Sequence, residues 1–202
     1  DNDVYVILKE DVDYRERGNT WVNGVEIEYF MNPPKQIRTY FKKETKSPHT
    51  AHILAFGRVD WKKDSVVDEL IEEAKLSWQT PPSSMTPLSL KLTRYQIDDL
   101  WKDWLDCIHR DDAFAGKWTQ MHYLDYATHA FCQVHQIWRT KNKRLEKQLS
   151  AISPAFVSLL KKATNEPWNA PASMHALHEL MAEYLGGKRS KEWILKGNLD
   201  LS

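Results

Sequence analysis

Residues 79–87 divide the chain into two parts that have different sequence patterns. This segment reads Gln-Thr-Pro-Pro-Ser-Ser-Met-Thr-Pro, and Pro and Ser at such density mark an exposed connection. Before it, short apolar runs alternate with helical patterns. After it, apolar residues recur at spacings of three and four, which predicts helices. We therefore predict an α+β fold, with a short mixed β-sheet domain over residues 1–80, a linker over 81–87 and an all-helical bundle over 88–202.

The composition bounds the size of the core and the class of partner. The chain has 202 residues, of which 42% are hydrophobic, and this suffices for one large or two small domains with a sizeable core. The formal net charge is zero, which argues against a nucleic-acid partner, because such binders need a basic face. Cys107 and Cys132 are the only cysteines, and no long apolar run occurs. A cytoplasmic protein with no membrane segment is the prediction.

Helices are predicted where apolar residues recur at spacings of three and four and where residues typical of helix ends flank them. Ser65 is expected to cap one of them, with Asp68 reaching back as in a capping box, and Gly186 is expected to end the last. The basic run 139–147 is interpreted as a solvated helix end. The predicted helices cover about residues 34–44, 49–56, 65–78, 88–108, 117–140, 152–163 and 172–185.

Two carboxylates precede the first apolar run. Asp1 and Asp3 lead directly into residues 4–8, Val-Tyr-Val-Ile-Leu, which we interpret as a central strand. Side chains alternate between the two faces of a strand, so both carboxylates share one face. Carboxylates that close repel each other unless a cation lies between them. The pair is therefore a candidate metal site, although acidic residues at strand ends are often only solvated.

A second acidic pair follows a predicted turn. Asn23-Gly24 is typical of a tight hairpin turn, and the residues after it have the pattern of a strand. Glu26 and Glu28 would share one face of that strand. If this strand pairs with the first one, the two acidic faces can meet. Carboxylate oxygens are ligands that Mg²⁺ uses in phosphate chemistry, together with substrate phosphates and water.

These residues, in this order, resemble the nucleotidyltransferase superfamily that includes the aminoglycoside nucleotidyltransferases. The similarity rests on the Asp-Asn-Asp strand start, on the later strand with Glu26 and Glu28, and on the Asn32-Pro33 helix start. Residues 56–60, Phe-Gly-Arg-Val-Asp, also look like a strand that the family places before a helix. The resemblance covers about the first 80 residues. A Gly-Ser segment that the family places before the Asp pair is not present, and we interpret the chain as the retained part of a longer protein whose nucleotidyltransferase core is incomplete at its N-terminal end.

The resemblance implies Mg²⁺-dependent transfer of a nucleoside monophosphate from a nucleoside triphosphate, most simply ATP, to a hydroxyl group. Asp1, Asp3 and Glu28 would be the metal ligands, and Glu28 is preferred to Glu26 because the family's residue commonly precedes an Asn-Pro helix start. The acceptor would be a small hydroxylated molecule similar to an aminoglycoside. In the family, a carboxylate on the first helix of the second lobe can act as the base. Asp99 and Asp103, which share a helix face with Tyr95, are the candidates.

Two other hypotheses stand beside this one. A nucleotidyltransferase-like module without catalytic activity would bind a partner or a nucleotide, as the antitoxin of a toxin–antitoxin pair does. A protein-modifying enzyme would instead transfer the nucleotide to Tyr, Ser or Thr. An upstream Gly-Ser segment would favour an enzyme over the binding module.

Overall fold

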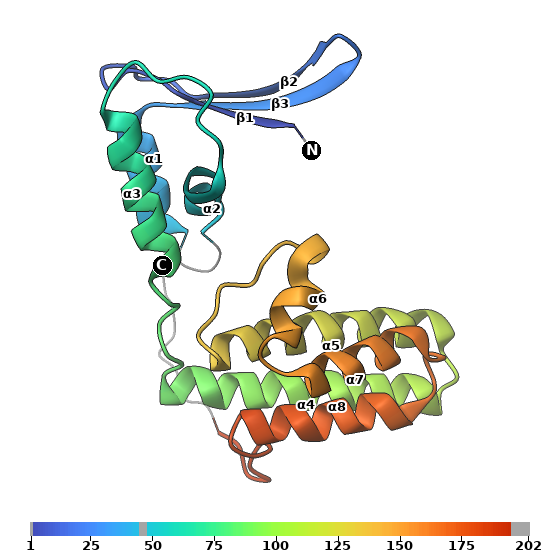
Figure 1. Ribbon diagram of the computed structural model, residues 1–202. Helices are drawn as coiled ribbons and strands as arrows, with labels where there is room; N and C mark the ends of the chain where they lie inside the picture. Colours follow the sequence, from blue (N-terminus) through green and yellow to red (C-terminus); the bar gives the residue numbers. More distant parts are fainter. Residues whose placement is uncertain (1, 45–47, 195–202) are drawn as a thin grey trace, which may run out of the picture. The chain divides into compact units, whose positions relative to one another are not determined.

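The computed structural model describes residues 2–44 and 48–194, and the chain divides into two compact units (Figure 1). The first unit is Asp1–Pro82 and the second is Ser83–Ser202. Over the described residues, the first unit contains a small mixed sheet with helices, and the second unit is helical. The predicted mixed α/β class, with a sheet followed by helices, is confirmed at this level.

In the described part of the chain, three strands form the sheet in the order β1-β3-β2. Strand β1 (Asp3–Ile7) is parallel to β3 (Val25–Asn32), and β2 (Glu16–Val22) pairs with β3 in an antiparallel hairpin. Asn23 and Gly24 have φ of 51° and 76°, as the predicted tight turn requires. The prediction that the first strand is central was wrong. Among the described strands β3 is central, because it pairs with β1 on one side and with β2 on the other, whereas β1 pairs with β3 alone.

Helices cover part of one face of this sheet. Helices α1 (Pro34–Lys43), α2 (His49–Phe56) and α3 (Val66–Gln79) enclose a core to which Tyr5 and Ile7 of β1 contribute. Side-chain alternation places Asp3 on the same face as these two residues, but Asp3 is exposed. Figure 1 shows the β2–β3 hairpin extending past the three helices. One end of the sheet is therefore apolar and covered, whereas the other end is open and polar.

Two local predictions for the first unit were wrong. Residues 56–60 form no strand: Phe56 ends α2, residues 57–60 lie in the connection to α3, and Arg58 pairs with Asp60 at 2.7 Å. Ser65 does not cap α3, since Asp64 accepts a hydrogen bond from the backbone N–H of Val66 at 3.1 Å. Asp68 does not reach back to Ser65 and pairs with Lys62 at 2.6 Å. In each case a charged side chain close in the sequence makes a contact in place of the expected arrangement.

The second unit contains long helices around a hydrophobic core. The helices are α4 (Pro87–His109), α5 (Ala113–Val134), α6 (Asn142–Ser150), α7 (Pro154–Asn165) and α8 (Pro171–Tyr184). Thr86 caps α4 by accepting a hydrogen bond from the backbone N–H of Ser89. The largest fully buried side chains include Trp104, Tyr123, Phe131 and Phe156. No helix in the described part of the chain is both long and apolar enough to cross a membrane.

The predicted helix over residues 117–140 is wrong at its C-terminal end. Helix α5 ends at Val134, and Gln136 adopts a φ of 51°, which a continuing helix does not permit. Gln148 then stabilises the connection: its Oε1 accepts from the backbone N–H of Thr140 at 3.1 Å, and its Nε2 donates to the carbonyl of Trp138 at 2.7 Å. The basic run 139–147 is thus a connection followed by the start of α6, rather than the end of α5.

Candidate functional site

The parallel pairing of β1 with β3 places two of the predicted metal ligands side by side. In the register of these strands Asp3 lies opposite Glu28, and the backbone N–H of Glu28 donates to the carbonyl of Asn2 at 3.1 Å. Glu26 shares the face of Glu28 but precedes it by two residues in β3. Asp1, the third predicted ligand, lies outside the described residues. The register therefore brings Glu28, rather than Glu26, directly opposite Asp3.

A hollow of about 520 Å³ lies over this open end of the sheet. Its lining comes from all three strands and consists mainly of carboxylate, amide and guanidinium groups. The lining residues are Asn2, Asp3, Arg17, Gly18, Asn19, Glu26 and Glu28. Because α1, α2 and α3 pack against the apolar end of the sheet, a charged ligand can enter the hollow without displacing their core.

Side chains of β2 already contact the two glutamates. Arg17 donates from Nε and Nη2 to the same oxygen of Glu28, at 3.0 and 2.6 Å, and its guanidinium lies 4.9 Å from the centre of the Phe30 ring. Asn19 donates to Glu26 at 2.6 Å. These cross-strand contacts orient both carboxylates over the hollow.

The donor groups in this hollow are of the kind that Mg²⁺ requires. Asp3 and Glu28 offer carboxylate oxygens at neighbouring strand positions, and Mg²⁺ commonly takes one or two protein carboxylates and completes its shell with water and phosphate. Among the described residues, no group of three or more His, Cys, Asp or Glu side chains is placed to bind a metal. Asp3 and Glu28 could hold one ion, whose remaining positions water or phosphate oxygens would fill.

The candidate bases lie in the second unit. Asp99 and Asp103 are one turn apart on α4, with Asp99 half-buried and Asp103 exposed. The neighbouring Asp98 has a different environment, because it faces into the helical core. Sequence analysis singled out the first two carboxylates and missed the third.

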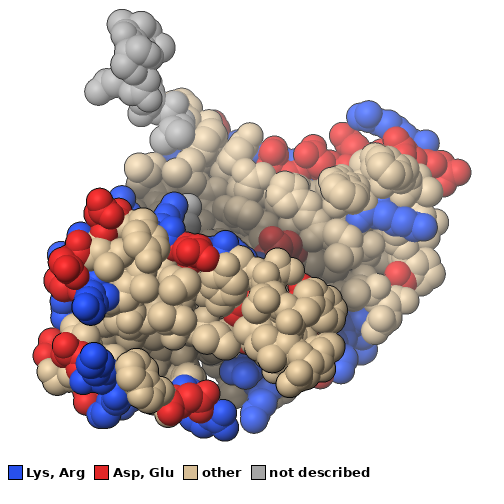
Figure 2. Space-filling view, turned by 90° about the horizontal axis from the view of Figure 1, so that it is seen from above, with Lys and Arg blue, Asp and Glu red and all other residues tan. Residues whose placement is uncertain are grey.

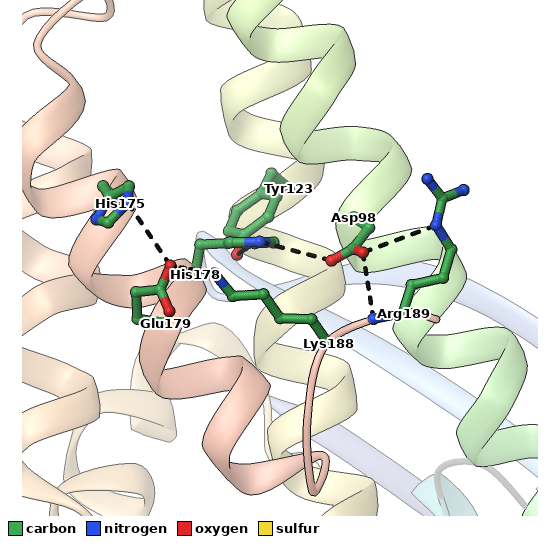
Figure 3. A network of polar contacts seen from close by, with 7 residues as sticks. All are labelled: Asp98, Tyr123, His175, His178, Glu179, Lys188 and Arg189. Carbon is green, nitrogen blue, oxygen red and sulfur yellow. Dashed lines mark hydrogen bonds and ion pairs between the residues drawn. The ribbon is translucent and has the colours of Figure 1, made fainter. Parts of the chain in front are cut away.

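A polar network in the helical core joins Asp98 to two buried residues from other helices (Figure 3). The hydroxyl of Tyr123 on α5 lies 3.2 Å from Nδ1 of His178 on α8, and Nε2 of His178 lies 3.5 Å from the carboxylate of Asp98 on α4. Asp98 also accepts a hydrogen bond from the backbone N–H of Arg189 at 3.3 Å. The signal that could have revealed this network is a histidine on the apolar face of α8, beside Leu177.

The network is a structural feature rather than an open site. His178 is 4% exposed, and burial lowers its pKa more than the nearby Asp98 raises it. Glu179 also acts to raise this pKa, while Lys188 and His175 act to lower it. Burial raises the pKa of the Tyr123 hydroxyl, which therefore stays protonated. The network joins α4, α5 and α8 through polar contacts within their core.

This environment predicts a pH dependence of stability. Because the pKa of His178 is lower in the folded state than its ordinary value of about 6.5, the unfolded chain binds more protons as the pH falls below that value. The free energy of unfolding should therefore be highest above about pH 6.5 and should decrease below it. Urea titrations between about pH 5 and 8 measure this.

The variant H178Q should reduce this slope. Any slope that remains is expected from His135, whose pKa is also lowered by burial. A wild-type protein that becomes more stable as the pH falls would show instead that the pairing of His178 with Asp98 outweighs burial.

No protein-family model, curated protein or solved structure matches the chain. The resemblance to the nucleotidyltransferases thus rests on the residues of the acidic strands and the helix start that follows them.

Proposed function

We propose that the protein is a Mg²⁺-dependent nucleotidyltransferase that transfers a nucleoside monophosphate from a nucleoside triphosphate, ATP in the simplest case, to a hydroxyl group of a small molecule. The observation that carries this proposal is the parallel register that sets Asp3 beside Glu28 over an open, polar hollow. This arrangement supplies oxygen ligands beside an open space of about 520 Å³ that phosphates could occupy.

In the proposed reaction the acceptor oxygen attacks the α-phosphorus of the nucleotide. A bond forms between this oxygen and the α-phosphorus, while the bond from the α-phosphorus to the bridging oxygen breaks and pyrophosphate leaves. The resemblance assigns the role of general base, which takes the proton of the acceptor hydroxyl, to Asp99 or Asp103. Asp3 and Glu28, together with Asp1, would hold Mg²⁺. The bound ion would neutralise phosphate charge and stabilise the charge that develops during transfer.

A noncatalytic, nucleotidyltransferase-like binding module is the second candidate. The contact between Arg17 and Glu28 favours it, because one expected metal ligand already has a cationic partner within the protein. The two candidates differ in whether the hollow binds a divalent ion with a nucleotide.

Titration calorimetry of the full-length protein with Mg²⁺ and a non-hydrolysable ATP analogue tests the proposal. Wild-type protein should bind the analogue only when Mg²⁺ is present. The variant E28Q should weaken binding by at least about tenfold, because it removes an anionic ligand while keeping the size of the side chain.

The matched variant E26Q distinguishes between the two glutamates. Glu26 lies on the same face and lines the same hollow, but it is not opposite Asp3, so E26Q should have a much smaller effect. A larger loss in E26Q than in E28Q would identify Glu26 as the ligand. Wild-type protein that binds no nucleotide with Mg²⁺ would favour the binding module.

A further inference from the structure

We propose that Arg17 is a phosphate-binding residue, which pairs with Glu28 in this structure and would instead contact the polyphosphate of a bound nucleotide. This inference rests on the proposed function and assigns a role to a residue of β2 that lies outside the acidic strands. It follows from the geometry of the ion pair, from the charge of the hollow and from the exposure of the pair.

The geometry of the ion pair leaves much of the guanidinium available. Nε and Nη2 of Arg17 both donate to a single oxygen of Glu28, at 3.0 and 2.6 Å. An arginine has five N–H donors in one plane. The guanidinium carbon lies over the ring of Phe30, at 4.9 Å from the ring centre, and this cation–π contact supports the group. Such a group can bind phosphate oxygens through its edge.

The lining of the hollow is rich in carboxylates, so a phosphate that enters it needs a cationic partner. Asp3, Glu26 and Glu28 contribute carboxylates to its lining, and Arg17 is the one Lys or Arg among the described lining residues. A nucleoside triphosphate that binds Mg²⁺ keeps a net negative charge, which the remaining carboxylates would repel. Arg17 is therefore the lining group that can offset this charge directly.

Because the ion pair between Arg17 and Glu28 is exposed, breaking it costs little free energy. The side chains of Arg17 and Glu28 are 70% and 40% exposed, and ion pairs in contact with water contribute little to stability. If Glu28 held a divalent ion, the guanidinium of Arg17 would be free to bind phosphate oxygens of the nucleotide. Without a nucleotide, Arg17 and a divalent ion would thus compete for Glu28. With a nucleotide bound, both would contact its phosphates.

This competition predicts opposite effects of one substitution on two measurements. In the full-length protein, R17A should bind Mn²⁺, used as a paramagnetic probe for Mg²⁺, roughly two- to fivefold more tightly than wild type when no nucleotide is present. The same variant should bind a non-hydrolysable ATP analogue with Mg²⁺ roughly ten- to a hundredfold more weakly, because a charge-assisted hydrogen-bonding group is lost. Electron paramagnetic resonance of free Mn²⁺ gives the first value, and titration calorimetry gives the second.

Two further variants separate charge from geometry. R17K keeps the positive charge but lacks the planar fork, so it should recover only part of the nucleotide affinity. R58A removes the same charge from an exposed pair with Asp60, which does not line the hollow, and should bind both ligands as wild type does. R17K also provides the test if R17A does not fold, since weaker nucleotide binding by R17K than by R58A is still expected.

Nucleotide affinity that is unchanged in R17A would overturn the proposal, and so would weaker Mn²⁺ binding in that variant. If E28Q weakens nucleotide binding while R17A does not, the metal site stands and the role of Arg17 falls. If wild-type protein binds neither Mn²⁺ nor the nucleotide, the proposed function itself fails, and the role of Arg17 with it.

Discussion

Replacing Asp3 with Asn should abolish the release of pyrophosphate from a nucleoside triphosphate by the full-length protein with Mg²⁺ and a hydroxylated acceptor. The substitution keeps the size of the side chain and removes one negative charge next to Glu28. Loss of a metal ligand costs several kcal/mol of transition-state stabilisation, which corresponds to a decrease in rate of roughly a thousandfold or more. A coupled pyrophosphate assay measures the rate.

Folding should survive this change, because Asp3 is exposed and its removal relieves repulsion between neighbouring carboxylates. D13N is a matched control, since Asp13 is an exposed carboxylate of the same unit in the connection between β1 and β2. It should keep the wild-type rate. Pyrophosphate release that persists in D3N would contradict the assignment of Asp3 as a metal ligand, and equal losses in both variants would point to a general effect of charge.

Replacing Phe131 with Ala should destabilise the helical unit by about 3–5 kcal/mol, because it removes a large buried side chain and leaves a cavity. Phe131 is fully buried on α5, and its ring centre lies 4.2 Å from that of Phe156 and 5.3 Å from that of Tyr184. The loss should appear as a lower urea midpoint with little change in the slope of the unfolding transition.

The same helix provides the control for this variant. Phe114 is 80% exposed and contacts the neighbouring Trp118 with a ring separation of 6.4 Å. F114A should therefore change the free energy of unfolding by about 0.5 kcal/mol or less. Similar losses in F131A and F114A would be inconsistent with the burial of α5 described here.

The features that the sequence predicted correctly are those that depend on neighbouring residues. Asn23-Gly24 determines a tight turn because both residues accept a positive φ. Alternation along a strand then places Glu26 and Glu28 on one face whatever the strand pairs with. Pro34 lies in the first turn of α1, where a missing N–H costs nothing.

The errors arose where other contacts compete with the local pattern. The apolar spacing after Val134 resembles more helix, but Gln148 binds the backbone of residues 138 and 140 and holds a connection there. Residues 56–60 have strand-like composition, yet the structure pairs no edge of the sheet with them. Neither outcome can be predicted from the sequence of a single turn or strand.

For the candidate site, the sequence by itself determined the chemical groups: acidic side chains at alternate positions of two strands. Only the tertiary structure decided which groups meet. The parallel register selects Glu28 as the residue opposite Asp3, and β2 brings Arg17 onto Glu28. In the helical core, packing of α4, α5 and α8 selects Asp98 rather than Asp99 to face His178. The physical reason is that side-chain periodicity follows from local backbone geometry, whereas register and helix packing follow from contacts between residues far apart in the chain.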